Sequence, residues 1–227
     1  MSAAAATIVR AQAVVKQYRR GHEIVCALRG VDFTQRAGEL IMLTGESGSG
    51  KSTLLNLFGC LDTPTSGRIE LFDLDAAAQT DRQRTRLRKE KIGFIFQDFH
   101  LIPVLSAVEN VAYALELRGL PGGRRRAAET LVRVGLADRL NAQVNTLSGG
   151  QMQRVAVARA LVGGPSLVLA DEPTANLDTH NKDQVMRLLT TLCREEGAAV
   201  LLVTHDLNLS RWVDRVVHLH DGRIALN

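Results

Sequence analysis

Short apolar runs alternate along this chain with longer stretches in which apolar residues have a helical spacing. This alternation predicts a mostly parallel sheet covered by helices. The strand candidates are the apolar runs 8–15, 40–44, 92–96, 167–170 and 200–204. We therefore expect an α/β fold.

The end of the sequence, residues 216–226, has a different pattern. Two short apolar runs are interrupted there by Asp221 and Gly222. Because an Asp-Gly pair between such runs is typical of a tight turn, we expect a β-hairpin in this segment.

Residues 104–163 have a mainly helical pattern. Ser106 and Glu109 have the spacing of a capping box, in which both side chains bind exposed amides at a helix start. The Pro121-Gly122-Gly123 sequence is expected to end that helix, and a second helix is expected over 124–134.

The whole chain, 1–227, is expected to form one domain, because its length suits a single α/β unit and can bury a substantial core without disulfides. Within it, we expect residues 98–160 to form a helical lobe inserted into the α/β core. Cys26, Cys60 and Cys193 are far apart in the sequence and indicate neither a disulfide framework nor a metal site. Isolated thiols of this kind are typical of a reducing cytosol.

The composition is that of a mildly basic globular protein, with a net charge of +4. Only 4% of the residues are aromatic, which argues against a stacked-aromatic platform, and no nucleic-acid partner is expected. The sequence has two clusters of basic residues, which we interpret as solvated surface faces. The alternative is that they bind anionic lipid headgroups or an acidic loop of a partner. The clusters are Arg82, Arg84, Arg86, Arg88, Lys89 and Lys91, and Arg124, Arg125 and Arg126.

No segment of the sequence predicts membrane insertion. The N-terminal residues do not have the pattern of a signal peptide. No apolar run approaches the ~20 residues that a membrane-spanning helix needs. If the protein acts on a membrane, we expect the spanning part to belong to another chain.

One glycine-rich segment, GESGSGKST at 45–53, fits the phosphate-loop pattern GxxxxGK[ST]. It follows the apolar strand candidate 40–44 and precedes a helical pattern, as the motif requires, so an ordinary flexible loop is a poor alternative. Glycines allow backbone amides to face a phosphate, and the helix N-terminus adds its positive dipole end. The predicted phosphate-binding residues are Gly45, Glu46, Ser47, Gly48, Ser49, Gly50, Lys51, Ser52 and Thr53.

Three side chains of this loop have separate expected roles. Lys51 supplies a cation for the β and γ phosphates, the Ser52 hydroxyl is a ligand for Mg²⁺, and Thr53 binds an α-phosphate oxygen. Glu46 introduces an acid at a variable position of the loop, and we expect its side chain to point outward.

A second strand candidate, 167–170, is followed directly by Asp171 and Glu172. Because ligands of α/β proteins bind at the carboxyl ends of the strands, both acids are expected at a crevice. Asp171 is suited to hold Mg²⁺, and Glu172 is suited to polarise an attacking water. An acidic strand end that caps a loop is the alternative, and the phosphate loop on the same chain argues against it.

Polar side chains also follow two other strand candidates. Gln97 comes after 92–96, and His205 comes after 200–204. Each would be an ordinary surface residue if it stood alone. Together with Gly45 and Asp171, they place a residue suited to nucleotide binding or hydrolysis at the end of four strand candidates.

The segment Leu147–Gln151, LSGGQ, leads into another helical pattern. Ser148 can cap that helix, and two glycines leave its first amides accessible. The segment therefore predicts a second anion site, with a plain capped helix as the alternative.

These motifs, in this order and over nearly the whole chain, closely resemble those of the ATP-binding cassette (ABC) ATPases. The resemblance implies a P-loop NTPase (RecA-like) core with a mostly parallel sheet, an N-terminal antiparallel β part and an inserted α-helical lobe. It implies ATP and Mg²⁺ as ligands and an ATPase reaction in which Lys51, Glu172 and His205 are catalytic. Ser52, Gln97 and Asp171 would hold the metal.

The resemblance also implies a head-to-tail dimer in which each ATP lies between one chain's phosphate loop and the other chain's LSGGQ. Ser148, Gly150 and Gln151 would then serve the neighbour's γ-phosphate, and Asp178 would couple the two sites. Tyr18 resembles the aromatic residue that stacks on adenine, with an ordinary strand aromatic as the alternative.

Three phrases, at 59–67, 91–111 and 167–179, are similar to those of the lipoprotein-releasing and macrolide-exporter branch of the family. This implies an integral-membrane permease as partner and a place on the inner face of the cell membrane. The permease contact is expected at 98–120, with core packing as the alternative for its apolar residues Phe99, Leu101, Ile102, Pro103 and Leu105.

Other functions stay open at this point. The main alternative is a cell-division ATPase that assembles or regulates cell-wall machinery. A family member acting on DNA or ribosomes and a P-loop kinase fit less well, because the former usually has two cassettes or long insertions and the latter would not explain LSGGQ.

Overall fold

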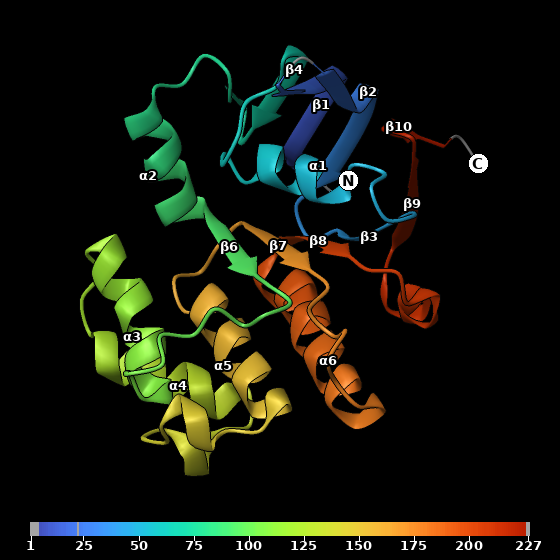
Figure 1. Ribbon diagram of the computed structural model, residues 1–227. Coiled ribbons are helices and arrows are strands. Elements are labelled where there is room, and N and C mark those ends of the chain that lie inside the picture. Colours follow the sequence, from blue (N-terminus) through green and yellow to red (C-terminus); the bar gives the residue numbers. More distant parts are fainter. Residues whose placement is uncertain (1–4, 22, 226–227) are drawn as a thin grey trace.

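The computed structural model describes residues 5–21 and 23–225 and arranges them as two sheets with helices around them (Figure 1). A four-stranded sheet has the order β2-β1-β4-β5, and a six-stranded sheet has the order β10-β9-β3-β8-β7-β6. The fold is therefore the expected α/β arrangement, and the pairs β1–β4, β3–β8 and β3–β9 join strands that are far apart in the chain.

The six-stranded sheet is parallel except at one edge. Its strands β6, β7, β8, β3 and β9 pair in parallel, and only β10 pairs antiparallel, with β9. Every residue of β3 and β8 is buried, as expected for a parallel sheet covered on both faces. The strands are β3 (Leu40–Thr44), β6 (Ile92–Ile95), β7 (Leu167–Asp171), β8 (Ala199–Val203), β9 (Arg215–His220) and β10 (Arg223–Ile224).

The antiparallel sheet comes from the N-terminal third of the chain. Its strands are β1 (Thr7–Arg20), β2 (Glu23–Arg36), β4 (Ser66–Leu71) and β5 (Leu74–Asp75). The strand candidate 8–15 covers only part of β1, and apolar periodicity did not identify the other three. Register shifts in the β1–β2 pairing explain part of the difference, because each bulge breaks the period-2 pattern.

Within the residues that the structure describes, six α-helices and three 3₁₀ helices connect the strands. They are α1 (Lys51–Phe58), α2 (Asp81–Lys91), α3 (Ala107–Arg118), α4 (Gly123–Arg133), α5 (Gly149–Leu161), α6 (Thr179–Glu196), η1 (Ala137–Arg139), η2 (Val144–Thr146) and η3 (Leu207–Trp212). The predicted capping box of Ser106 and Glu109 is confirmed at the start of α3. That helix ends slightly earlier than expected, at a left-handed Gly119, before Pro121 is reached.

The first basic cluster lies on α2, a helix without buried residues. Arg84 and Arg86 form ion pairs with Asp81 and Glu90 of the same helix. In the second cluster, on α4, Arg124 and Arg125 lie near Glu109 and Glu129. These contacts agree with the expectation of solvated charged faces.

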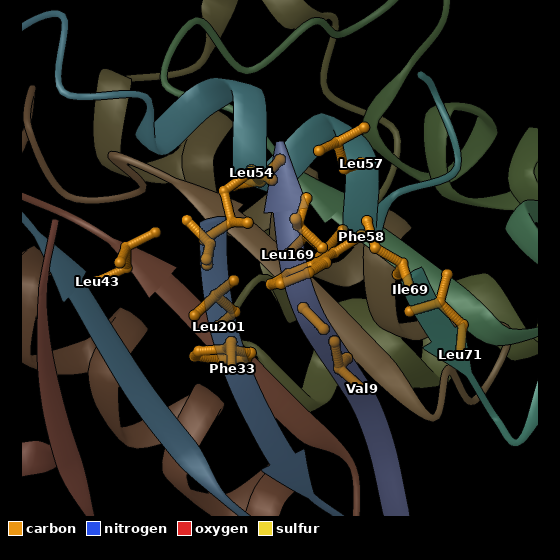
Figure 2. Close-up of a cluster of buried hydrophobic side chains, with 14 of the residues drawn as sticks. Val9, Phe33, Leu43, Leu54, Leu57, Phe58, Ile69, Leu71, Leu169 and Leu201 are labelled. Carbon is orange, nitrogen blue, oxygen red and sulfur yellow. The ribbon is translucent and has the colours of Figure 1, made fainter. Parts of the chain in front are cut away.

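The largest hydrophobic cluster lies between the two sheets and α1 (Figure 2). Phe33 of the antiparallel sheet stacks on Phe58 of α1, with ring centroids 5.2 Å apart. Leu169 and Leu201 reach this cluster from the parallel sheet. The packing fixes α1, and with it the segment that precedes α1, against one face of the parallel sheet.

Two further clusters organise the rest of the molecule. One covers the opposite face of the parallel sheet and includes residues of α5 and α6. The other joins α3, α4 and α5, and it supports the predicted helical lobe, whose limits of 98 and 160 remain a prediction. No helix among the described residues is long and apolar enough to cross a membrane.

Candidate functional site

Residues 45–50 of the phosphate loop connect β3 to α1, and their backbone has a conformation that glycine allows. Gly45, Gly48 and Gly50 all have positive φ angles. A Cβ at Gly45 would lie 2.1 Å from the carbonyl oxygen of Leu219, and one at Gly50 would lie 2.5 Å from that of Ala27. Glycine is therefore required at both positions, for reasons of space as well as conformation.

Helix α1 begins at Lys51, and no side chain caps its N-terminus. The first amides of a helix have no partner within the helix, so those of α1 are available to an anion held in the loop. The Lys51 Nζ donates hydrogen bonds of 2.7 Å to the carbonyl oxygens of Gly45 and Glu46. The ammonium group thus lies across the loop, and the Glu46 residue is exposed, as expected.

Ser52 and Asp171 come together from α1 and the end of β7. Burial and the neighbouring charge of Glu172 raise the pKa of Asp171, while a hydrogen bond with the Ser52 side chain and the charge of Lys51 partly oppose the shift. A hydroxyl and a carboxylate are the hard oxygen donors that Mg²⁺ prefers. The two residues therefore fit the metal role predicted for them.

Glu172 has a left-handed backbone, with φ 46°, immediately after β7. This conformation is uncommon for a residue other than glycine and redirects the side chain at the strand end. One carboxylate oxygen, Oε2, accepts a hydrogen bond of 3.2 Å from Thr204 Oγ1. The other, Oε1, lies 2.8 Å from His205 Nδ1. The end of β8 thus holds the carboxylate by both oxygens.

A cavity of about 370 Å³ lies beside this pair. Its lining includes Glu172, Ala175, Thr204 and His205. The Glu172 side chain is 16% exposed and that of His205 is 74% exposed. A reactant entering the cavity therefore meets a carboxylate that is oriented by the protein and an accessible imidazole.

Gln97 is exposed, two residues beyond the end of β6. The next residues include Phe99 and His100, which both have positive φ angles. Arg159 of α5 holds them, because its guanidinium donates to the carbonyl oxygens of Phe99, at 2.8 Å, and of His100. The segment after Gln97 is thus tied to the helix that LSGGQ begins.

LSGGQ forms the start of α5, as the sequence predicts. Ser148 is the N-cap, its Oγ accepts from the Gln151 amide at 3.3 Å, and Gln151 Oε1 accepts from the Ser148 amide at 2.9 Å. A Cβ at Gly150 would lie 2.5 Å from Asn181 Oδ1. Asn181 in turn donates to Asp178, the N-cap of α6, so the first turns of α5 and α6 are packed together.

LSGGQ and the phosphate loop belong to different parts of the chain's own fold. Helix α1 packs on the face of the parallel sheet that looks toward β1 and β2, and α5 contributes to the opposite face (Figure 1). Among the described residues, no hydrogen bond joins Leu147–Gln151 to residues 45–53. The chain thus presents two separate candidate anion sites.

Tyr18 lies on β1 with 37% of its surface exposed. Its hydroxyl donates a hydrogen bond of 2.9 Å to Asp62 Oδ2. Sequence reasoning pointed to Tyr18 but missed Asp62, as well as Thr204, Arg159 and Asn181. The strand-end position of Thr204 beside His205 and the three-residue spacing of Asp178 and Asn181 were usable signals, whereas Asp62 and Arg159 have their partners in distant segments.

Comparison with known proteins identifies relatives over nearly the whole chain. A family model described as ABC transporter matches residues 28–175. An ABC transporter ATP-binding protein of Methanocaldococcus jannaschii, MJ0796, is 44% identical over 96% of this chain and 95% of its own. The lipoprotein-releasing system ATP-binding protein LolD of Anaeromyxobacter dehalogenans is 49% identical over 96% of this chain and 92% of its own.

The similarity extends to a longer protein and to solved structures. The macrolide export ATP-binding/permease protein MacB of Syntrophobacter fumaroxidans is 45% identical over 96% of this chain, which spans only 31% of MacB. A dimeric structure of the ATP-binding cassette MJ0796, in a post-hydrolysis state bound to ADP and Pi, superimposes with a TM-score of 0.90 at 42% identity. The match covers 96% of this chain and 97% of that one.

Proposed function

The chain belongs to the ABC transporter family as an ATP-hydrolysing subunit, and we propose that it works with a separate permease and that its residues divide the work as follows. The phosphate loop and the α1 N-terminus bind the phosphates of ATP, with Lys51 on the β and γ phosphates and Thr53 on the α phosphate. Gly45, Glu46, Ser47, Gly48, Ser49 and Gly50 supply the backbone of this cradle. Tyr18 stacks on the adenine.

A divalent metal belongs to this proposal. Ser52 and Asp171 would hold Mg²⁺, with Gln97 approaching from the end of β6. When bound, the ion would neutralise charge on the β and γ phosphates. The protein's own contribution at this point is the contact between the Ser52 hydroxyl and the Asp171 carboxylate, which brings the phosphate loop to the end of β7.

The arrangement around Glu172 carries the proposal for hydrolysis. A carboxylate held by Thr204 and His205 can accept a proton from water in one fixed direction, which general base catalysis requires. His205 is exposed and can reach the γ-phosphate from the same side. We assign Glu172 as the group that polarises water, with Lys51 and His205 stabilising the charge of the transferred phosphoryl group.

The working unit in this proposal is a head-to-tail dimer. The two candidate anion sites of one chain are separate, and a dimer lets Ser148, Gly150 and Gln151 of one protomer complete the phosphate site of the other. Asp178 and Asn181 link LSGGQ to the first turn of α6. ATP would favour the closed dimer to the extent that it binds the closed state more tightly than the open one.

The permease contact is proposed on the helical lobe near Gln97. Val104 is 82% exposed, and Tyr113 and Leu117, four residues apart on α3, are 41% and 50% exposed. Two roles were predicted for the apolar residues of 99–105, permease contact and core packing. Leu101 packs on the core of the lobe, whereas Pro103 is exposed. Binding there would place the chain on the inner face of the membrane through its permease.

Purified protein tests the nucleotide assignment directly. Wild type is expected to bind ATP and hydrolyse it in the presence of Mg²⁺, and Lys51→Ala is expected to lose binding. Lys89→Ala, on the exposed helix α2, is the matched control and should behave as wild type. Equal binding by wild type and Lys51→Ala would contradict the assigned phosphate loop.

Co-purification tests the partner. A permease recovered with the tagged protein would support the transporter role, and recovery of cell-wall or division proteins without transport activity would favour the cell-division alternative. The substrate of the permease and the direction of its movement would then follow from that partner.

A further inference from the structure

The Tyr18 ring is held from two sides by Lys16 and Asp62, two residues to which no role has been assigned so far. Tyr18 pairs with Val25 across the β1–β2 ladder, and both residues are exposed. Lys16, two residues earlier on β1, is buried at 9% exposure. A buried ammonium beside an exposed ring needs a specific partner, because burying an unpaired charge is costly.

That partner is Asp62, in the loop that follows α1. Lys16 Nζ donates hydrogen bonds of 2.6 Å to Asp62 Oδ1 and 2.8 Å to the carbonyl oxygen of Thr63. The Thr63 amide donates to Asp62 Oδ1 at 2.7 Å, and the Tyr18 hydroxyl donates to Asp62 Oδ2 at 2.9 Å. Both carboxylate oxygens are thus engaged, and the tyrosine hydroxyl is fixed by a charge-assisted hydrogen bond.

The other contact is on the face of the ring. Lys16 Nζ lies 4.9 Å from the Tyr18 ring centroid, at the distance of a cation–π interaction. A cation on one face leaves the opposite face for a planar group. It also reduces the negative charge of the π system, which weakens the repulsion that disfavours face-to-face stacking.

The hydroxyl end of the ring also meets the phosphate loop. Burial and Asp62 raise the pKa of Tyr18, and a hydrogen bond with the Thr53 side chain opposes this shift. The hydroxyl is also bonded to Asp62, in the loop that follows α1, so the ring is linked to the helix that begins at Lys51. The spacing between the ring and the phosphate cradle is therefore set by the protein.

We propose that Asp62 and Lys16 are positioning residues for the base of the nucleotide, holding Tyr18 as a stacking platform at a fixed distance from the phosphate loop. The proposal rests on the assignment of the phosphate loop as the ATP site. It places base recognition in a Lys16–Tyr18–Asp62 unit. The unit pre-orders the ring, so that less conformational freedom is lost when the base binds.

Two ligands separate base positioning from phosphate binding: ATP with Mg²⁺, and inorganic tripolyphosphate with Mg²⁺, which has no base. Calorimetric titration of Tyr18→Phe is expected to give a dissociation constant for ATP about 3- to 10-fold higher than wild type, the size of one hydrogen bond. Asp62→Ala is expected to weaken ATP binding at least as much, because it frees the ring and Lys16 together. Tripolyphosphate should bind all variants as it binds wild type.

The turnover measurement should show the same division. Both variants are expected to raise KM for ATP and to retain kcat at saturating ATP. Asp81→Ala is the matched control, since Asp81 lines the same cavity as Asp62 but pairs with Arg84, and it should change neither ligand's affinity. Tyr18→Phe keeps the Lys16–Asp62 ion pair and remains informative if Asp62→Ala does not fold.

Two outcomes would overturn the proposal. Unchanged ATP affinity in Tyr18→Phe would show that the hydroxyl anchor does not position the base. Equal weakening of ATP and tripolyphosphate would show a general loss of the site. Failure of the ATP-site assignment would look different, because wild type itself would then bind neither ligand.

Discussion

Nδ1 of His205 lies 2.8 Å from Oε1 of Glu172. These two side chains follow the neighbouring strands β8 and β7, so they are joined at the carboxyl ends of the parallel strands. Because an ionised carboxylate can only accept, the imidazole donates this hydrogen bond and its Nε2 is left to face a ligand. Thr204 occupies the second carboxylate oxygen. The geometry gives Glu172 one orientation and leaves His205 exposed for another contact.

Glu172→Gln is expected to retain ATP binding and to lower kcat about 10²- to 10⁴-fold, the range for loss of a general base. The amide keeps the size of the side chain but cannot take a proton from water. Turnover assays with nucleotide binding measured on the same sample check this, and light scattering should detect a dimer trapped by ATP. Glu90→Gln, on the exposed face of α2, is the control. Normal turnover in Glu172→Gln would contradict the role of this residue.

Ser148→Arg is expected to impair hydrolysis while ATP binding by the isolated chain changes little, because Ser148 lies apart from the chain's own phosphate loop. Mixing it in equal amounts with Lys51→Ala should restore activity. With random pairing of protomers, about a quarter of the composite sites would then be intact. No recovery in the mixture, although both variants remain folded, would count against sites shared between protomers.

Two glycines of the phosphate loop should differ in their tolerance of alanine. Gly48→Ala meets no atom within 4 Å and is expected to cost about 1–2 kcal/mol, the strain of a left-handed alanine. Gly45→Ala places its Cβ 2.1 Å from the carbonyl oxygen of Leu219, which should add about 1–3 kcal/mol of overpacking. Chemical denaturation measures both. Equal stability of the two variants would mean that β9 moves aside freely.

Asp171→Asn is expected to stabilise the ligand-free protein while abolishing Mg²⁺-dependent turnover. Burial raises the pKa of Asp171, so the fold favours the protonated form. Its contribution is then most favourable below the unfolded pKa of about 3.9 and is lost as the pH rises through the higher folded pKa. At neutral pH, removing the charge should raise Tm by about 2–4 °C for each 1 kcal/mol gained. The gain should disappear at low pH, and a gain independent of pH would contradict this cause.

Local features of the fold could be predicted from the sequence. The capping boxes at Ser106 and Ser148 require residues only three positions apart, and the structure contains both. The strands β3 and β7 are apolar over residues 40–43 and 167–170, so their burial on both faces is visible in the sequence. Helix α2 was not predicted, because it has no buried residue and hence no apolar period to detect.

Contacts between distant segments could not be predicted in the same way. Nothing in the sequence distinguishes Arg159 from other residues of its helix. In the structure its guanidinium donates to the carbonyl oxygens of Phe99 and His100, two residues with left-handed backbone. Asp62 lies in an irregular loop, and only the folded chain brings it to Tyr18. No period or spacing in the sequence encodes these pairs, since each depends on how separate elements pack.

The sequence by itself determined the kinds of chemistry available to this protein: a glycine-rich phosphate cradle, acids at a strand end and a second capped helix start. These depend on residue type and local spacing, which a linear chain already contains. The tertiary structure decided which groups meet. The strand order β3-β8-β7-β6 brings the phosphate loop, Asp171, Glu172 and His205 together at the carboxyl ends of the strands. LSGGQ lies apart from them, because it begins α5, which packs on the face of the sheet opposite α1. The reason is that parallel strands align their carboxyl ends whatever their separation in the chain.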